Sequence, residues 1–163
     1  AAKKGHLSIL KYAHENGCPW DEETCRYAAN GNLDCLVYAH ENGCPWDEWT
    51  CSGAAIECHL DCLKYAHENG CPWVEKTCSY AACWGDLECL KYAHENGCPW
   101  NERVCEWAAE KGNLDCLKYS RENGCPWNED TCWYAADNGE LDCLKYAIDN
   151  GCPHTQEHLD LLS

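Results

Sequence analysis

The chain has 163 residues, a length typical of one domain, and 28 acidic against 12 basic side chains give it a formal charge of −16. This charge disfavours binding to nucleic acid or to anionic membranes, and it favours a basic partner through long-range attraction. No apolar run approaches the roughly 18 residues of a membrane span, and no basic-then-apolar leader is present. We therefore expect neither a nucleic-acid nor a membrane partner.

A four-residue block, Gly-Cys-Pro-Trp, returns along the chain and marks it as a repeat array. Complete copies begin at Gly17, Gly43, Gly70, Gly97 and Gly124. An altered sixth copy runs from Gly151 to His154. Successive copies lie 26 residues apart once and 27 apart thereafter. A fixed period of 20 to 50 residues is typical of solenoids, in which each repeat rests on its neighbours.

We expect a single array over residues 1–163. Its predicted parts are a partial repeat at 1–20, repeats at 21–46, 47–73, 74–100, 101–127 and 128–154, and a capping helix at 155–163. The chain contains no Met and opens within a repeat, so we expect it to be a piece of a longer protein.

Each repeat is predicted to begin with a short helix, called helix one, which runs in the first complete copy from Asp21 to about Ala29. Asp21 suits the N-cap, because its side chain can accept a hydrogen bond from an unpaired amide of the first turn. Trp20 and Cys25 take the two positions of a hydrophobic staple. The N-cap position is held in later copies by Asp47, Val74, Asn101 and Asn128.

A second helix, helix two, follows a tight link and carries apolar residues on two adjoining stripes, a pattern that predicts burial on both flanks. In the first complete copy these residues are Leu33, Cys35, Leu36, Tyr38 and Ala39. The helix is predicted to end at 42–43, because Gly can adopt the left-handed conformation there and the following Pro cannot continue a helix. No strand is indicated.

Two short helices per repeat predict an all-α fold, an α-solenoid of stacked helix-turn-helix repeats. Residues 24–29 (Thr-Cys-Arg-Tyr-Ala-Ala) and 112–119 (Gly-Asn-Leu-Asp-Cys-Leu-Lys-Tyr) resemble the two-helix core of the ankyrin repeat, and the resemblance covers essentially the whole chain. The usual ankyrin unit has about 33 residues. The residues missing here fall where that family carries its projecting hairpin, so the resemblance implies truncated hairpin loops.

Eighteen cysteines in so short a chain would suggest a disulfide framework in a secreted protein. Fifteen of them, however, recur as three per repeat at the positions of Cys25, Cys35 and Cys44. Because free Cys behaves as a small buried hydrophobe, we expect buried thiols and a cytoplasmic protein. One bridge per repeat, of the Cys25–Cys35 kind, remains an alternative and would indicate secretion.

Metal binding and catalysis find little support in the sequence. No Cys-x-x-Cys pair occurs, and the histidine that precedes a Cys by one turn is replaced by Arg121 and Ile148 in the last two copies. We interpret the histidines as favourable partners of the helix C-terminus. They are His14, His40, His67 and His94. No phosphate loop or nucleophile elbow occurs, so we expect no enzyme, no cofactor and no metal.

Helix one and its exit vary from copy to copy, whereas helix two is nearly constant. The ankyrin resemblance implies that helix one lines the concave face, where the varied columns would form a binding strip containing residue types that anchor interfaces. The predicted partner-binding residues are Glu23, Arg26, Tyr27, Trp49, Ser52, Lys76, Tyr80, Trp84, Arg103, Glu106, Trp107, Asp130, Trp133 and Tyr134.

The function predicted from these patterns is a monomeric, non-catalytic scaffold that binds a protein partner, with a basic partner favoured by charge. Two alternatives are a cysteine-rich metal-binding or redox protein and a structural array that assembles end to end. Cys58 stands where other copies have Gly between the helices. A left-handed residue there would be strained by about 1 kcal/mol.

Overall fold

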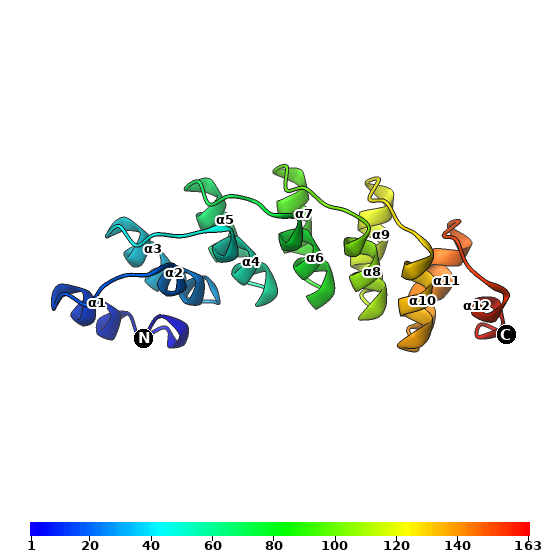
Figure 1. Ribbon diagram of the computed structural model, residues 1–163, viewed down its shortest axis with the longest axis horizontal. Helices are drawn as coiled ribbons and strands as arrows, with labels where there is room; N and C mark the ends of the chain where they lie inside the picture. The colour runs from blue at the N-terminus through cyan, green and yellow to red at the C-terminus, as the bar shows by residue number, and fades with distance from the viewer. The chain divides into compact units, whose positions relative to one another are not determined.

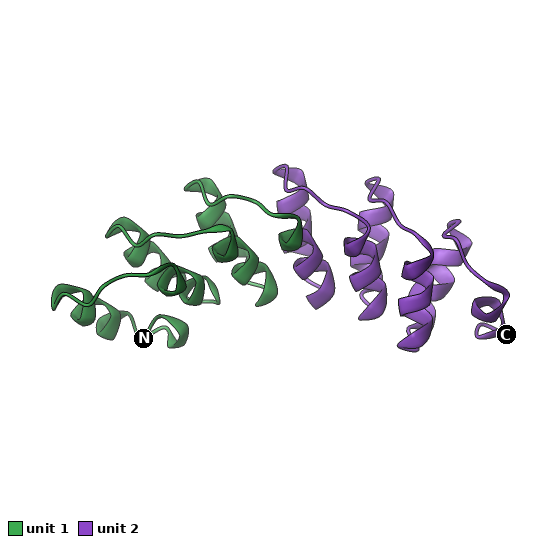
Figure 2. Ribbon diagram, viewed as in Figure 1, with its two compact units in different colours: residues 1–77 green, residues 78–163 purple.

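The computed structural model describes residues 1–163, which form twelve α-helices and one short 3-10 helix, with no strand (Figure 1). The all-α prediction is confirmed. The chain divides into two compact units, residues 1–77 and 78–163, and the division falls within helix α6 (Figure 2). None of the helices is both long enough and apolar enough to cross a bilayer.

Unit 1 consists of helical pairs joined by short links. Its elements are η1 (Ala2–Lys4), α1 (Leu7–Glu15), α2 (Glu22–Ala29), α3 (Leu33–Glu41), α4 (Glu48–Ile56), α5 (Leu60–Glu68) and the first residues of α6 (Glu75–Trp84). Helices α2 and α4 pack against each other, and α3 packs against α1 and α5. Within this unit, the first helices of the repeats therefore form one layer and the second helices form another.

Unit 2 repeats this arrangement. It contains the remainder of α6, α7 (Leu87–Glu95), α8 (Arg103–Glu110), α9 (Leu114–Glu122), α10 (Glu129–Asp137), α11 (Leu141–Asp149) and α12 (Gln156–Asp160). Helix α8 packs against α10, α9 packs against α7 and α11, and the short α12 rests on α10.

Helix one begins where the sequence predicts, because the N-cap side chains satisfy amides of the first turn. Asp21 accepts a hydrogen bond from the Thr24 amide at 3.0 Å. Asp47 and Asn128 make the corresponding bond to the amide two residues on, each at 3.0 Å. Such caps contribute about 1 kcal/mol each.

Helix two ends in a Schellman motif, as expected from the Asn-Gly-Cys-Pro sequence. In α3 the Gly43 amide donates to the His40 carbonyl and the Cys44 amide to the Ala39 carbonyl, both at 3.0 Å. Gly43 has φ = 80°, the left-handed conformation that this motif requires. Because the motif is local in sequence, it fixes the ends of the repeat independently of its neighbours.

The core is built from the same positions in every repeat. One leucine of each complete helix two is fully buried, namely Leu36, Leu63, Leu90, Leu117 and Leu144. Burial of a leucine side chain contributes roughly 1.5–3 kcal/mol. The small alanine pairs of helix one, such as Ala28 and Ala29, are also fully buried and allow close approach of neighbouring helices.

The cysteines occupy this core. All fifteen periodic cysteines are buried, Cys83 is half-buried, and Cys18 and Cys58 are exposed. No disulfide joins any of them. The pairing that we considered across the hairpin, Cys25 with Cys35, is wrong. The Cys25 thiol instead lies 3.8 Å from the carbonyl oxygen of Cys44, because the loop after helix two folds back over helix one of the same repeat.

Cys58 adopts the left-handed conformation that its position predicts. Its φ is 60°, and it is the non-glycine residue with positive φ in the chain. The same position between the helices is held elsewhere by glycines such as Gly85 and Gly112, with φ of 77° and 71°. Cys58 therefore carries the strain of a Cβ in a region that favours Gly.

Candidate functional site

The tryptophans fall into two classes, those of the repeated block and those of the varied columns of helix one. Those of the Gly-Cys-Pro-Trp block contact a histidine or an arginine of the same repeat and a tyrosine of the next one, and we call this series of contacts the ring ladder. The centroid of the Trp20 ring lies 4.5 Å from that of His14 and 6.4 Å from that of Tyr38 in the next repeat. Nδ1 of His14 and Oη of Tyr38 are 3.3 Å apart. Trp20 therefore forms a contact between repeats.

The ladder also explains the periodic histidines. Nδ1 of His94 is hydrogen-bonded to Oη of Tyr119 at 2.9 Å, and its ring lies on Trp100 with centroids 3.8 Å apart. Where the sequence has Arg121 in place of His, the guanidinium lies 4.5 Å from the ring centroid of Trp127. A flat cation can replace the imidazole because both stack on the indole. Ring stacking, rather than the helix terminus alone, thus accounts for these histidines.

The second class of tryptophan lies on the varied columns of helix one. In unit 2, Trp84 is 60% exposed and Trp133 is 52% exposed. The Trp107 ring lies 5.6 Å from that of Tyr80, and the Trp133 ring lies 5.2 Å from that of Tyr134. We call these five residues on α6, α8 and α10 the aromatic face. Large rings exposed in this way are a feature of interaction surfaces.

The surroundings of the aromatic face are acidic. Residues 101–113 and 128–140, which include α8 and α10, contain seven acidic and two basic side chains. One of the two basic residues, Lys111, is already paired with Glu110 at 2.7 Å. The other, Arg103, is exposed, as is Asp130 near the start of α10. The local charge therefore favours a cationic partner.

Glu106 is the most buried of the predicted site carboxylates, with 8% of its surface exposed. Its Oε1 accepts a hydrogen bond from Nδ2 of Asn128 at 3.1 Å. Burial raises the pKa of Glu106, and the hydrogen bond from Asn128 opposes this shift. None of the chain's ion pairs involves Glu106. The carboxylate thus lies in a poorly solvated place with one neutral hydrogen-bond partner, and the Arg103 cation acts on it through charge alone.

The corresponding positions in unit 1 differ in one important respect, since cations of the chain itself cover the rings. Lys76 Nζ lies 4.9 Å from the Trp49 ring centroid, and Lys3 Nζ lies 5.6 Å from that of Tyr27. Glu23 and Arg26 are exposed. The rings of the aromatic face in unit 2 have no such cation.

One predicted contact residue is inaccessible. Ser52 is fully buried, and its Oγ lies 3.1 Å from the Glu48 carbonyl and 3.3 Å from Oγ1 of Thr77. We therefore remove Ser52 from the predicted surface. Asn128, which positions the Glu106 carboxylate, was not predicted, because its N-cap role already explained it.

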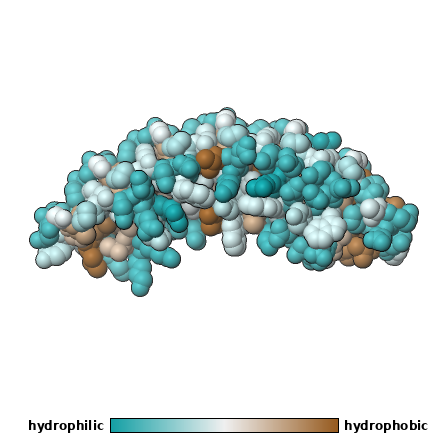
Figure 3. All heavy atoms as spheres, viewed as in Figure 1, coloured by the Kyte–Doolittle hydropathy of each residue, from teal (hydrophilic) through white to brown (hydrophobic).

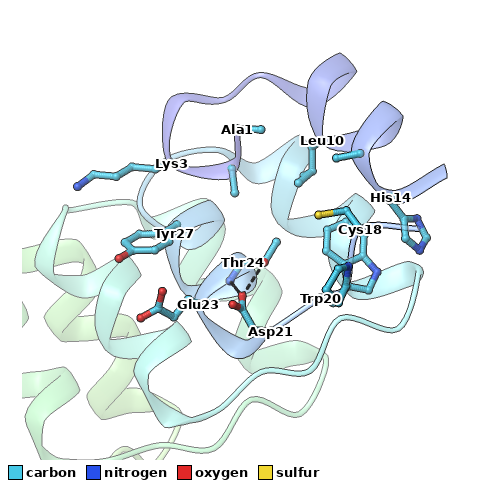
Figure 4. A pocket seen from close by; sticks show the side chains of 13 residues that line it. Ala1, Lys3, Leu10, His14, Cys18, Trp20, Asp21, Glu23, Thr24 and Tyr27 are labelled. Atoms are coloured by element: carbon cyan, nitrogen blue, oxygen red, sulfur yellow. Dashed lines mark hydrogen bonds between the residues drawn. The ribbon is translucent and has the colours of Figure 1, made fainter. Parts of the chain in front are cut away.

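A pocket of about 450 Å³ lies in unit 1 between the residues of η1 and α1 and helix α2 (Figure 4). It is lined by Leu10, Trp20 and Tyr27 among others, and its carboxylate Asp21 is occupied in capping, through bonds to the amide and hydroxyl of Thr24. One side of the pocket is formed by the three-residue η1. We assign no ligand to this pocket.

No group of three or more His, Cys, Asp or Glu side chains is arranged to hold a metal ion. On the face seen in Figure 3, apolar residues form small patches among hydrophilic ones.

Stacked pairs of short helices define the class of protein, a helical-repeat solenoid. No family model and no curated protein sequence matches the chain. Among solved structures, the chain is similar to the ankyrin repeat domain of human ASB11, with a TM-score of 0.67 and 19% identity over 79% of this chain and 69% of that one. The protein thus has the ankyrin-repeat fold that the sequence resemblance indicated.

Proposed function

We propose that the protein is a non-catalytic scaffold that binds a basic segment of another protein through the aromatic face of unit 2. The observation that carries the proposal is the exposure of Trp84 and Trp133 on helices whose surroundings are acidic. Trp and Tyr dominate binding energy at interfaces, and Lys or Arg above an indole gains about 0.5–2 kcal/mol from the cation–π interaction.

The contrast between the two units supports a basic partner. In unit 1, Lys76 lies over Trp49, which shows the kind of contact that a partner's Lys or Arg would make with the uncovered rings of unit 2. The buried Glu106 carboxylate would gain from a partner cation, because a charge in a poorly solvated place is stabilised by an opposite charge. The ankyrin-repeat fold of solved domains such as that of human ASB11 is compatible with such a scaffold.

The proposal includes a monomeric state and a cytoplasmic location. The buried cysteines at core positions support a reducing compartment, where thiols persist. No observation on these residues favours the metal-binding or self-assembly alternatives over partner binding.

The proposal is tested by selecting random peptides on the immobilised protein and measuring their affinity by fluorescence anisotropy. We expect wild type to select peptides rich in Lys and Arg, and the double variant Trp107→Ala with Trp133→Ala to bind them at least 10-fold more weakly. Lys145→Ala, at an exposed ion pair outside the aromatic face, is the matched control and should bind normally. Equal binding by the double variant would exclude this face, provided that circular dichroism shows all three proteins folded.

A further inference from the structure

Ten of the buried cysteines are arranged as five pairs, one in each complete repeat. In each pair a cysteine of helix one lies beside the cysteine of the Gly-Cys-Pro loop of the same repeat. The helix-one thiol donates to the backbone carbonyl of the loop cysteine, at 3.8 Å from Cys25 to Cys44 and at 3.9 Å from Cys51 to Cys71. The pairs are Cys25 with Cys44, Cys51 with Cys71, Cys78 with Cys98, Cys105 with Cys125, and Cys132 with Cys152. Every member of these pairs is buried.

The loop cysteine is held in place by the start of helix one. Its thiol donates to the carbonyl of the residue that begins the repeat, as in Cys44 to Asp21 at 3.3 Å and Cys125 to Asn101 at 3.2 Å. The same contact is 3.2 Å for Cys71 and 3.1 Å for Cys152. The position of the loop cysteine against the start of helix one is thus a repeated feature of the fold.

The two members of a pair are not equivalent. Cys44 is 3% exposed, whereas Cys25 is fully buried. A hydrogen bond from the Cys25 thiol lowers the pKa of Cys44, and the same bond raises the pKa of Cys25, so that the proton stays on Cys25. Interaction with the helix-one thiol also lowers the pKa of Cys71 and of Cys152. In these three repeats the loop cysteine is therefore the one suited to attack as a thiolate.

We propose that each pair is a site of reversible oxidation, in which a peroxide converts two thiols into a disulfide within one repeat. The thiolate of Cys44 attacks one peroxide oxygen, forming the sulfenic acid and releasing hydroxide. The Cys25 thiol then attacks the Cys44 sulfur, forming the disulfide and releasing water. The two sulfurs lose two electrons to the peroxide, and a dithiol reductant restores both thiols.

Oxidation should stabilise the fold, because each disulfide would join two segments that are distant in the sequence. Cys25 and Cys44 lie 19 positions apart, and closing a loop of this size restricts the unfolded chain. The bridge would tie the loop after helix two to helix one, so the oxidised array should melt at a higher temperature. We expect a rise of about 5 °C or more, reversed by dithiothreitol.

The test maps bridges after peroxide treatment of the native chain. The exposed or half-exposed thiols are first replaced, as Cys18→Ser, Cys58→Gly and Cys83→Ser, and the wild-type chain is mapped in parallel. After oxidation, denaturation and alkylation, we expect ten of the fifteen remaining cysteines to resist alkylation. Peptides cleaved from the protein should be linked pair by pair, with two hydrogens lost for each bridge.

Two matched variants sharpen the result. Cys44→Ala should leave Cys25 open to alkylation and remove one link, whereas Cys35→Ala should leave all five links in place. Links to other cysteines, or oxidation to sulfinic acids without links, would overturn the proposal. Because the wild-type map requires no variant to fold, it decides the question alone. Peptide binding on the aromatic face is a separate readout, so either proposal can fail without the other.

Discussion

The imidazole of His40 lies flat on the indole of Trp46, with ring centroids 3.9 Å apart and planes 11° apart. Nδ1 of the same histidine is hydrogen-bonded at 3.0 Å to Oη of Tyr65 in the next repeat. The most constant residues of the chain therefore form the contact between neighbouring repeats. This relationship distinguishes tryptophans that stabilise the fold from those available to a partner.

Replacing a ladder tryptophan should destabilise the protein. Trp46→Ala removes the stack with His40 and the edge contact with Tyr65, and we expect it to lower the free energy of unfolding by about 2 kcal/mol. Urea denaturation followed by circular dichroism measures the effect. Trp133→Ala, which removes an exposed ring, is the control and should stay within about 0.5 kcal/mol of wild type; equal losses would mean that the two classes are not distinct.

Replacing Cys58, the cysteine in the left-handed conformation, by glycine should stabilise the protein. Cys58→Gly removes a Cβ from a residue with φ of 60°, and we expect a net gain of about 0.5 kcal/mol after the added flexibility of the unfolded chain is subtracted. Thermal denaturation of this variant is compared with that of Cys58→Ala, which keeps the strain and should gain nothing.

The reverse substitution is predicted at a glycine of the same kind. Gly112 has φ of 71°, and a Cβ there would meet the carboxylate of Glu140. Gly112→Ala should therefore cost about 1–2 kcal/mol. An unchanged melting temperature would show that this link readily adopts another conformation.

The N-cap position of one repeat is held by a valine, whose side chain cannot accept a hydrogen bond. Val74 directly precedes α6, at the position where Asp47 caps α4. Val74→Asp should raise the free energy of unfolding by about 0.5–1 kcal/mol, and Asp47→Ala should lower it by about 1 kcal/mol. Chemical denaturation of the two variants and wild type gives both values, and a loss on introducing Asp would contradict the capping argument.

Glu106 should make stability depend on pH. Because burial raises its folded pKa above the ordinary value of 4.5, the folded state binds more protons than the unfolded state between these two pKa values, and stability falls as the pH rises through this window. Glu106→Gln removes the cost of the buried charge. The variant should therefore exceed wild type in free energy of unfolding, and the difference should be largest at pH 7. Chemical denaturation of both proteins at pH 4 to 7 measures this difference in free energy of unfolding. A difference that increases as the pH falls would refute the prediction.

The ends of the helices could be predicted because their signals are local. The Gly43 turn and the Asp21 cap depend on residues a few positions away, so the sequence contains everything needed to place them. The cysteine pairing could not be predicted in the same way. Cys25 meets Cys44 only because the loop folds back across helix one, and that return path is set by the tertiary structure.

One residue of the predicted binding surface, Ser52, was wrong for a similar reason. Ser52 and Trp133 occupy the same column of the repeat, yet one is fully buried and the other is 52% exposed. At α4, Thr77 covers that flank and bonds to Ser52. A column of residues in a repeat alignment does not show which flank a neighbour covers, so only the structure separates the two.

The ring ladder has a mechanical consequence. In unit 1, Tyr38 and Tyr65 each reach back to the histidine of the preceding repeat, 24 and 25 positions earlier, so the contacts between repeats lie in series along the unit and can break one after another. A unit stretched between its ends should therefore yield in steps, and each step should lengthen the chain by one repeat of about 27 residues.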